Sequence, residues 1–491
     1  MSQVSPSYFF YDLETSGISP RDARIMQFAG QRTDMELKPI GEPVNLLVKL
    51  TPDIVPEPDA IMLTGITPQS TVADGLTEVE FLQELNEQVI KPNTIFLGFN
   101  TVRFDDRFME FLFYRNFDDP YAWRWQDGCS RWDMLDLVRI TRALRPDGIE
   151  WPVNPDGSAT NRLELLTKVN GLAHDQAHDA LSDVHATIAV AKLIRDKQPK
   201  LFNYMLNIRG KKDVIKLITA GDAFVYATGK YPKETLHTSA AIVLAEKQGK
   251  RDSGSFLIYD LRHDPTPFFD LTVDEIIEAW QWSRDPEKLR LPVKSLKANN
   301  CPAVSPLGVL DEAAQQWIKL DIETIQRNVS ILKTRHAEFT DKLLQATAKM
   351  DTERDKTYEA EPKDCDTQIY EGFVSDADKT LSRAIRASKP DELMSYEPKL
   401  HDERLKKILP RYKARNYPTS LSSDERKAWD EFCYHRLLDG GDNGRLGKYF
   451  KRLEELAAKT ELSENQRYLL EELQLYGESI MPIPDDSQAE E

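Results

Sequence analysis

The sequence has few cysteines, no excess of positive charge and no long apolar run. Its four cysteines lie far apart and form no Cys-x-x-Cys pair, which argues against a zinc site or a disulfide framework and predicts free thiols in a reducing compartment. No apolar run approaches the ~18 residues that cross a bilayer. The N-terminus lacks the basic region followed by an apolar one that marks a secretory signal. We therefore expect a cytoplasmic protein without a membrane partner.

The shortage of positive charge restricts the class of function. The formal net charge of −17 argues against a protein that coats nucleic acid with a generally basic surface. It does not exclude a nuclease, because a local cationic groove and bound metal ions attract phosphate on an acidic protein. Hydrophobic residues make up 40% of the chain and charged residues 30%, the balance of a globular protein. The 491 residues suffice for about two to four domains.

The first part of the chain, residues 1–198, alternates strand-like and helix-like segments, which predicts an α/β layer fold. Its strands are expected at residues 8–15, 24–31, 44–50 and 94–99. Its helices are expected at residues 81–89, 132–144, 163–169 and 180–194.

The rest of the chain changes character twice. Residues 199–350 contain short β-like runs with turn formers near or between them and then two long helices over 311–349, which predicts a small β-rich domain with a helical extension. Alternating charges predict a linker over residues 351–366. Residues 367–482 have a helical pattern throughout, with candidate N-caps at Ser375 and Ser422. We expect residues 483–491 to be a disordered tail.

The first strand ends in two acids. Four aromatic residues, Tyr8 to Tyr11, lead into Asp12 and Glu14, and an aromatic run favours a buried strand. Side chains two apart on a strand share a face, so the two carboxylates repel each other at the end of this strand. A divalent cation would offset that repulsion. The alternative is an ordinary strand end whose acids are solvated.

Two later segments carry further candidates. Asp105 follows a turn from a strand into a helix, where the helix dipole alone could account for an acid, and this simpler explanation fits Asp106 better. Asp183 borders the apolar stripe of a helix, and His178 precedes it by five residues, at a position from which an imidazole can reach a site that Asp183 faces. The alternative for His178 is a helix-start histidine without a role.

These motifs gain weight in combination. The order Asp-x-Glu, then Asn-x-x-x-Phe-Asp, then His-x-x-x-x-Asp resembles the DEDDh exonuclease superfamily, which has a ribonuclease-H-like fold. The resemblance implies a mixed sheet flanked by helices and two Mg²⁺ ions, with Mn²⁺ as a substitute. It further implies that the metal ligands are Asp12, Glu14, Asp105 and Asp183, that Glu14 also contacts substrate, and that His178 is the general base.

More distinctive motifs narrow the resemblance to the bacterial exonuclease I family. They are found at residues 113–123, 130–133, 143–149, 376–378 and 415–418, whereas the segment at 65–68 occurs in many members of the superfamily. The resemblance implies processive 3′-to-5′ degradation of single-stranded DNA to 5′-mononucleotides in DNA repair and recombination. It also implies an SH3-like middle domain and an all-helical C-terminal domain. The implied partner is the acidic C-terminal tail of the single-stranded DNA-binding protein, and we expect a monomer.

Substrate contacts require cations and stacking surfaces. Tyr121, Trp123 and Trp125 supply rings close to Arg124, and we expect at least one of them to belong to the core. By resemblance, the DNA contacts are Tyr121, Trp125, Arg139 and Arg162, with Arg162 as the phosphate ligand beside the site. Further cations that could line a channel are Lys294, Lys297, Arg411, Lys413 and Arg415, although a basic cluster is more often a solvated face.

Two other functions compete with this interpretation. A 3′-to-5′ exoribonuclease of the same superfamily could use the first domain, because only the 2′-hydroxyl separates the substrates. The extra β-rich and helical domains favour the DNA enzyme. A non-catalytic single-stranded DNA-binding scaffold would be expected to have lost at least one of the five site residues, and all five are present.

Overall fold

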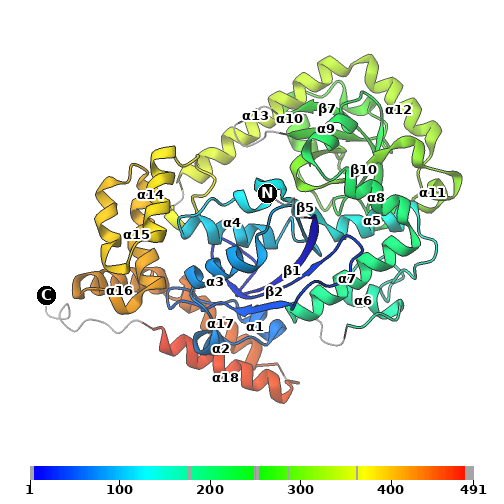
Figure 1. Cartoon of the computed structure of the whole chain (residues 1–491). Coiled ribbons are helices and arrows are strands. Elements are labelled where there is room, and N and C mark those ends of the chain that lie inside the picture. Colours follow the sequence, from blue (N-terminus) through cyan, green and yellow to red (C-terminus); the bar gives the residue numbers. More distant parts are fainter. Residues whose placement is uncertain are drawn as a thin grey trace.

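A five-stranded mixed sheet lies at the centre of the molecule (Figure 1). The computed structural model describes residues 5–174, 179–247, 249, 254–285, 287–360, 363–459 and 461–481. The strand order is β3-β2-β1-β4-β5, with β1 antiparallel to β2 and parallel to β4. The strands are β1 (Ser7–Thr15), β2 (Ile25–Thr33), β3 (Val44–Leu47), β4 (Thr94–Gly98) and β5 (Ser130–Asp133).

Strand β1 is central because both of its faces are apolar. Tyr8 and Phe10 pack into the cluster that includes the helices after β5, whereas Phe9, Tyr11 and Leu13 pack on the opposite face. Strand alternation therefore directs the next two side chains on the Tyr8 face, Asp12 and Glu14, toward the same side as those later helices.

Helices cover both faces of this sheet. The Phe9 face is covered by α3 (Glu78–Glu84), a π-helical turn (Leu85–Val89) and α4 (Asp105–Arg115). The Tyr8 face is covered by α5 (Met134–Leu144), α6 (Leu163–Val169) and α7 (Ala180–Lys197). Two short helices, α1 (Pro58–Thr64) and α2 (Pro68–Asp74), follow β3, and α8 (Pro199–Asn207) and α9 (Lys211–Ile218) lead into the next domain.

The second domain contains an antiparallel five-stranded sheet in the order β10-β6-β7-β8-β9. Its core is continuous with the cluster on the Tyr8 face of the first sheet. The strands are β6 (Phe224–Ala227), β7 (Thr238–Glu246), β8 (Ser255–Asp260), β9 (Val293–Lys297) and β10 (Ala303–Pro306). The helices are α10 (Val273–Trp280), α11 (Glu312–Trp317), α12 (Ile322–Thr334) and α13 (His336–Ala360).

The C-terminal part is helical and packs on the first domain in two places. Aromatic residues of α4 share a core with α14 and α15, and α17 and α18 contact α1 and α2 below the sheet (Figure 1). Ser375 and Ser422 are N-caps, as the sequence predicts. The helices are α14 (Asp376–Ala387), α15 (Glu403–Asn416), α16 (Ser423–Leu438), α17 (Arg445–Ala457) and α18 (Glu464–Ser479), with a 3₁₀ segment at Pro390–Lys399.

The three-part fold class predicted from the sequence is confirmed, and several elements differ. The helix predicted over 132–144 begins at Met134, because Ser130–Asp133 is extended and pairs with β4, and Asp133 caps the helix. The two long helices predicted over 311–349 are three helices, α11 to α13.

Most of the predicted linker, residues 351–360, is helical. Helix α13 runs through it as far as Ala360 and, in Figure 1, extends from the second domain toward the C-terminal helices. Ion pairs one turn apart, such as Asp351 with Arg354 and Glu353 with Lys356, help a solvated helix form from an alternating charge pattern. The predicted tail at 483–491 lies outside the described residues.

All four cysteines, Cys129, Cys301, Cys365 and Cys433, are buried as free thiols in three different parts of the fold. Over the described part of the chain, none of the helices combines the length and apolar character needed to span a bilayer.

Candidate active site

Three carboxylates meet at the C-terminal end of β1. Asp12 and Glu14 reach the site from β1, and Asp183 reaches it from the first turn of α7. One carboxylate oxygen of each residue lies within 4.8 Å of the others, and all three side chains are half-buried. Helix α7 begins here because the Asp179 carboxylate accepts a hydrogen bond from the Ser182 amide at 2.9 Å. This arrangement unites three of the acids predicted from separate motifs.

The fourth predicted acid, Asp105, reaches β1 from helix α4. It is the first residue of α4, it is buried, and its carboxylate accepts a hydrogen bond from the Leu13 amide at 3.1 Å. Leu13 is the residue between Asp12 and Glu14. Burial, and after it the charge of Asp12, raises the pKa of Asp105 well above its usual range. The two carboxylates therefore interact electrostatically although they come from different elements.

Without a bound cation, the carboxylates of this cluster disfavour one another's ionisation. Burial, followed by the charge of Asp183, raises the pKa of Asp12 well above its usual range, and burial, followed by the charge of Asp12, raises the pKa of Glu14 to about 9. Clustered carboxylate oxygens are the donors that hard divalent cations require, and a cation would remove the mutual repulsion. The donor set therefore fits Mg²⁺ or Mn²⁺ better than a thiol-binding metal.

This clustering predicts a pH dependence of stability. The folded protein without metal binds a proton at Glu14 up to about pH 9, whereas the unfolded carboxylate releases it near pH ~4.3. The melting temperature in EDTA should therefore fall as pH rises between these values. The fall should be smaller in Glu14→Gln, and added Mg²⁺ should raise the melting temperature more at pH 8.5 than at pH 5.5. An identical pH dependence in both proteins would contradict this assignment.

The predicted histidine, His178, lies outside the described residues. A second histidine, His174, lies in the site, where its Nε2 is 2.5 Å from Oδ1 of Asp183 and its Nδ1 is 3.1 Å from the Thr167 hydroxyl. Sequence reasoning missed His174, although the repeat Ala-His-Asp at 173–175 and 177–179 could have indicated it. His174 holds Asp183 in place through this contact.

A cavity of about 480 Å³ opens beside the acids. Asp12 and Asp183 line it together with two predicted DNA contacts, Arg139 and Arg162. Arg139 pairs with Asp136 at 2.7 Å, whereas Arg162 has no carboxylate within ion-pair distance in the described chain. The remaining lining residues are Phe99, Asn100, Leu135, Asn154, Ala159, Thr160, Asn161, Leu163, Glu164, Lys233 and His237.

Two of these lining residues come from the second domain. Lys233 and His237 lie in the connection between β6 and β7, so this domain completes the wall of the cavity and adds a cation to it. The sequence holds no local signal for this, because the two residues lie 50 and 54 positions beyond Asp183 and only tertiary packing brings them close.

The other predicted aromatic DNA contacts, Tyr121 and Trp125, do not line this cavity. The Trp125 side chain is 61% exposed, and the Tyr121 ring lies 4.9 Å from the Arg124 guanidinium carbon. Trp123 is buried among Tyr11, Phe96 and Phe113. The expectation that one ring of the three belongs to the core is therefore confirmed.

The basic cluster of α15 is not a free cationic surface. Arg415 is buried and donates to Asp53 at 2.8 Å and to Asp366 at 2.5 Å. Arg411 pairs with Asp364, and Lys413 pairs with Glu425 at 2.7 Å. All three residues already pair with carboxylates within the fold, so they do not form the free cationic lining that the sequence suggested. Of the other two cations, Lys294 lies 5.4 Å from the Tyr231 ring and Lys297 is exposed.

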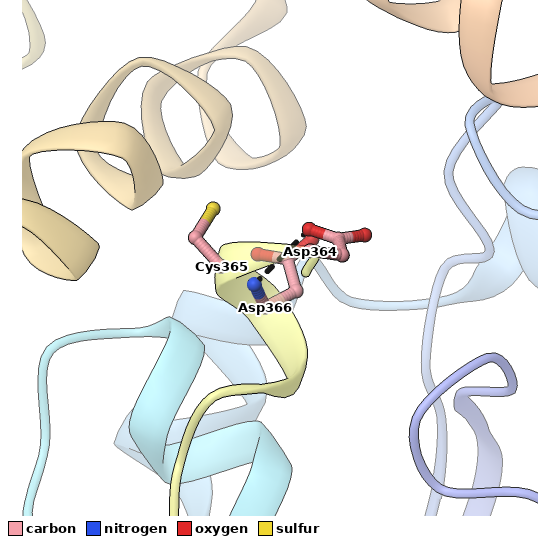
Figure 2. A group of neighbouring side chains, drawn as sticks. All are labelled: Asp364, Cys365 and Asp366. Atoms are coloured by element: carbon pink, nitrogen blue, oxygen red, sulfur yellow. Dashed lines mark hydrogen bonds between the residues drawn. The ribbon is translucent and has the colours of Figure 1, made fainter. Parts of the chain in front are cut away.

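A second group with metal-ligand side chains, Asp364, Cys365 and Asp366, is shown in Figure 2. Its carboxylates are already occupied, because Asp364 accepts from Arg411 and Arg436, and Asp366 accepts from Arg415. Burial raises the pKa of the Cys365 thiol to about 12, which disfavours the thiolate that a metal would need. This group is therefore part of an ion-pair network and not a metal site.

Comparison with known proteins matches three successive regions of the chain to family models. Residues 9–191 match the family model described as exonuclease, residues 209–348 match the exonuclease I SH3-like domain, and residues 363–480 match the exonuclease I C-terminal domain. Exodeoxyribonuclease I of Escherichia coli K12 is 36% identical over 433 residues, which cover 87% of this chain and 88% of that protein.

Solved structures agree over nearly the whole length. Exonuclease I from Methylocaldum szegediense has 38% identity and a TM-score of 0.89, covering 97% of this chain and 100% of that one. A zinc-bound E. coli exonuclease I complex with single-stranded DNA has 33% identity and a TM-score of 0.89, covering 97% and 99%. A complex described as SSB and exonuclease I with an inhibitor has 34% identity and a TM-score of 0.87, covering 97% and 100%. The chain belongs to the exonuclease I family.

Proposed function

We propose that the protein is a single-strand-specific exonuclease that removes 5′-mononucleotides from the 3′ end of DNA. The observation that carries this proposal is the cluster of Asp12, Glu14 and Asp183 at the edge of a cavity that also contains Arg162. The carboxylates suit divalent metal ions, and the guanidinium suits a phosphate. The polarity and the preference for single strands rest on membership of the exonuclease I family.

Asp12, Glu14, Asp105 and Asp183 would hold two Mg²⁺ ions, for which Mn²⁺ could substitute. Such ions neutralise the charge that develops on the phosphate and assist both the attacking and the leaving oxygen. A related exonuclease I binds zinc in the presence of single-stranded DNA, which supports a metal role for the matching site. The choice of Mg²⁺ rests on the all-carboxylate donor set.

The protein's own groups would position the reactants. Arg162 binds a phosphate oxygen from the wall of the cavity, and Arg139, held by Asp136, adds a second cation to the same wall. His174 fixes the carboxylate of Asp183. His178 would take the proton from the attacking water, because a neutral imidazole is available near physiological pH.

The general-base assignment is open to a direct test with a matched control. His178→Ala should lower the turnover rate by about 10²- to 10⁴-fold while leaving the affinity for single-stranded DNA in EDTA unchanged. His174→Ala should instead weaken metal binding and raise the half-saturating Mg²⁺ concentration, because His174 contacts a proposed ligand. Near-normal turnover of His178→Ala would refute the assignment.

The partners follow from the family. We propose that the protein docks the acidic tail of the single-stranded DNA-binding protein, which is supported by the complex that a related exonuclease I forms. We further propose that it acts as a monomer in the cytoplasm. Enclosure of the strand by the three parts of the chain would make it processive. Processivity is tested by adding heparin, which captures any enzyme that leaves its strand, and then measuring the length of the DNA products. Strands shortened by only a few nucleotides in one binding event would contradict enclosure of the strand.

A labelled-oligonucleotide assay tests the function itself. Single- and double-stranded DNA labelled at either end, and RNA of the same sequence, are incubated with the protein in Mg²⁺ or EDTA. The expected result is Mg²⁺-dependent release of mononucleotides from the 3′ end of single-stranded DNA alone. Faster cleavage of RNA would favour the exoribonuclease, and binding without cleavage would favour the scaffold.

A further inference from the structure

The residue after Asp105 is buried in an ion-pair network behind the site. Asp106 is 1% exposed, so it is not the solvated helix-start acid that its sequence position suggests. One of its carboxylate oxygens accepts a hydrogen bond from the Tyr11 hydroxyl, and the other pairs with the Arg131 guanidinium. Its own amide donates to the Thr101 carbonyl at 2.9 Å. Both oxygens and the backbone of Asp106 are thus held.

The partners of Asp106 come from two strands that flank a third. Tyr11 lies on β1 directly before Asp12, and Arg131 lies on β5, with β4 between them. Asp106 therefore joins β1 and β5 to the first turn of α4. Arg131 is itself fixed by the second domain, because it donates to the Asn299 carbonyl at 2.7 Å and its own carbonyl accepts from the Cys301 thiol at 3.3 Å.

Two contacts clamp α4 to the strand on either side of Asp12. Asp105 accepts from the amide of Leu13, which follows Asp12, and Asp106 accepts from the side chain of Tyr11, which precedes it. Loss of the second contact would leave the start of α4 held to β1 by a single hydrogen bond near the site. The two contacts together hold the start of α4 against the segment of β1 that carries Asp12.

We propose that Asp106 is a positioning residue that, through Tyr11 and Arg131, sets the distance between Asp105 and Asp12 for metal binding. This inference rests on the proposed role of Asp105 as a metal ligand. Groups that orient metal ligands typically affect metal affinity or activity by about 10- to 100-fold.

The experiment compares Asp106→Asn with a control at the far end of the same helix. Glu78 is a buried carboxylate whose partner, Arg115, ends α4, so Glu78→Gln also removes charge from a buried carboxylate–arginine pair. Binding of Mn²⁺ is measured by calorimetry, the half-saturating Mg²⁺ concentration by nucleotide release, and single-stranded DNA affinity in EDTA. Tyr11→Phe is a milder second variant that keeps the ion pair and loses one hydrogen bond.

We expect Asp106→Asn to weaken Mn²⁺ binding and to raise the half-saturating Mg²⁺ concentration by about 10- to 100-fold, with unchanged DNA affinity in EDTA. Tyr11→Phe should change Mn²⁺ affinity and the half-saturating Mg²⁺ concentration in the same directions but by smaller factors. Glu78→Gln should lower only the melting temperature. Unchanged metal binding in Asp106→Asn and Tyr11→Phe would overturn the inference, as would equal metal effects in Glu78→Gln. Full activity of Asp105→Asn would instead refute the metal role on which the inference rests, so the two failures are distinguishable.

Discussion

Asp12→Asn should abolish nucleotide release, with a fall in rate of about a thousandfold or more. Bound metal contributes several kcal/mol of transition-state stabilisation, and each ~1.4 kcal/mol corresponds to a tenfold change in rate. Substitution of Asp12 should cause the largest loss of metal binding, because Asp12 belongs to the three-carboxylate cluster and also interacts with Asp105. The measurement is the shortening of 5′-labelled single-stranded DNA across a Mg²⁺ titration.

The matched control is Glu164→Gln, which removes a carboxylate charge from the same cavity but outside the cluster. It should retain most of the activity. Asp12→Asn should also show a smaller Mg²⁺-induced rise in melting temperature than the wild type, because the substitution removes part of the repulsion that the cation offsets. Equal Mg²⁺ effects on stability, or unchanged cleavage at any Mg²⁺ concentration, would contradict the ligand role.

Arg415→Met should destabilise the contact between the C-terminal helices and the first domain by about 3–5 kcal/mol. Arg415 lies on α15 and pairs with Asp53, which follows β3, and with Asp366. All three side chains are buried, so methionine would leave two carboxylates in the interior with less compensation. The decrease can be measured by urea unfolding and localised by hydrogen exchange in α15 and in residues 50–57.

An exposed ion pair across the same contact provides the control. Arg452 of α17 donates to Asp59 of α1 at 2.8 Å, but the side chains are 39% and 57% exposed. Arg452→Met should therefore cost at most about 1 kcal/mol. A loss as small as this in Arg415→Met would show that the buried network contributes little.

The same network makes the contact sensitive to acid. Burial alone would raise the pKa of Asp53 and Asp366, but the charge of Arg415 holds the pKa of both well below the usual range. Their stabilising contribution is thus complete above the unfolded pKa of ~3.9 and is lost as pH falls below it. Arg415→Met should remove most of this acid sensitivity.

Strand β1 and its two acids could be predicted because the signals for them lie within one short segment of the sequence. The aromatic run before Asp12 and the alternation that pairs it with Glu14 need no knowledge of the rest of the chain. The ordered motifs then supplied Asp105 and Asp183. Trp132 was assigned to a helix because a four-residue strand carries too little periodicity to be separated from the helix that follows it.

The residues whose roles could not be predicted from the sequence owe those roles to tertiary contacts. Asp106 has the sequence context of a helix-start acid, and only its burial against Tyr11 and Arg131 reveals the network behind the site. Arg415 was mistaken for a surface cation because its partner Asp53 lies 362 positions away. Lys233 likewise joins the cavity through domain packing.

The burial of all four cysteines gives the protein a set of internal reporters. Burial raises the pKa of Cys301 to about 11 and of Cys365 to about 12, so the native thiols are poor nucleophiles and are shielded from alkylating reagents and peroxide. Cys129 belongs to the first domain, Cys301 to the second and Cys433 to α16. The order in which the thiols become alkylated under mild denaturant would therefore reveal which part of the fold opens first.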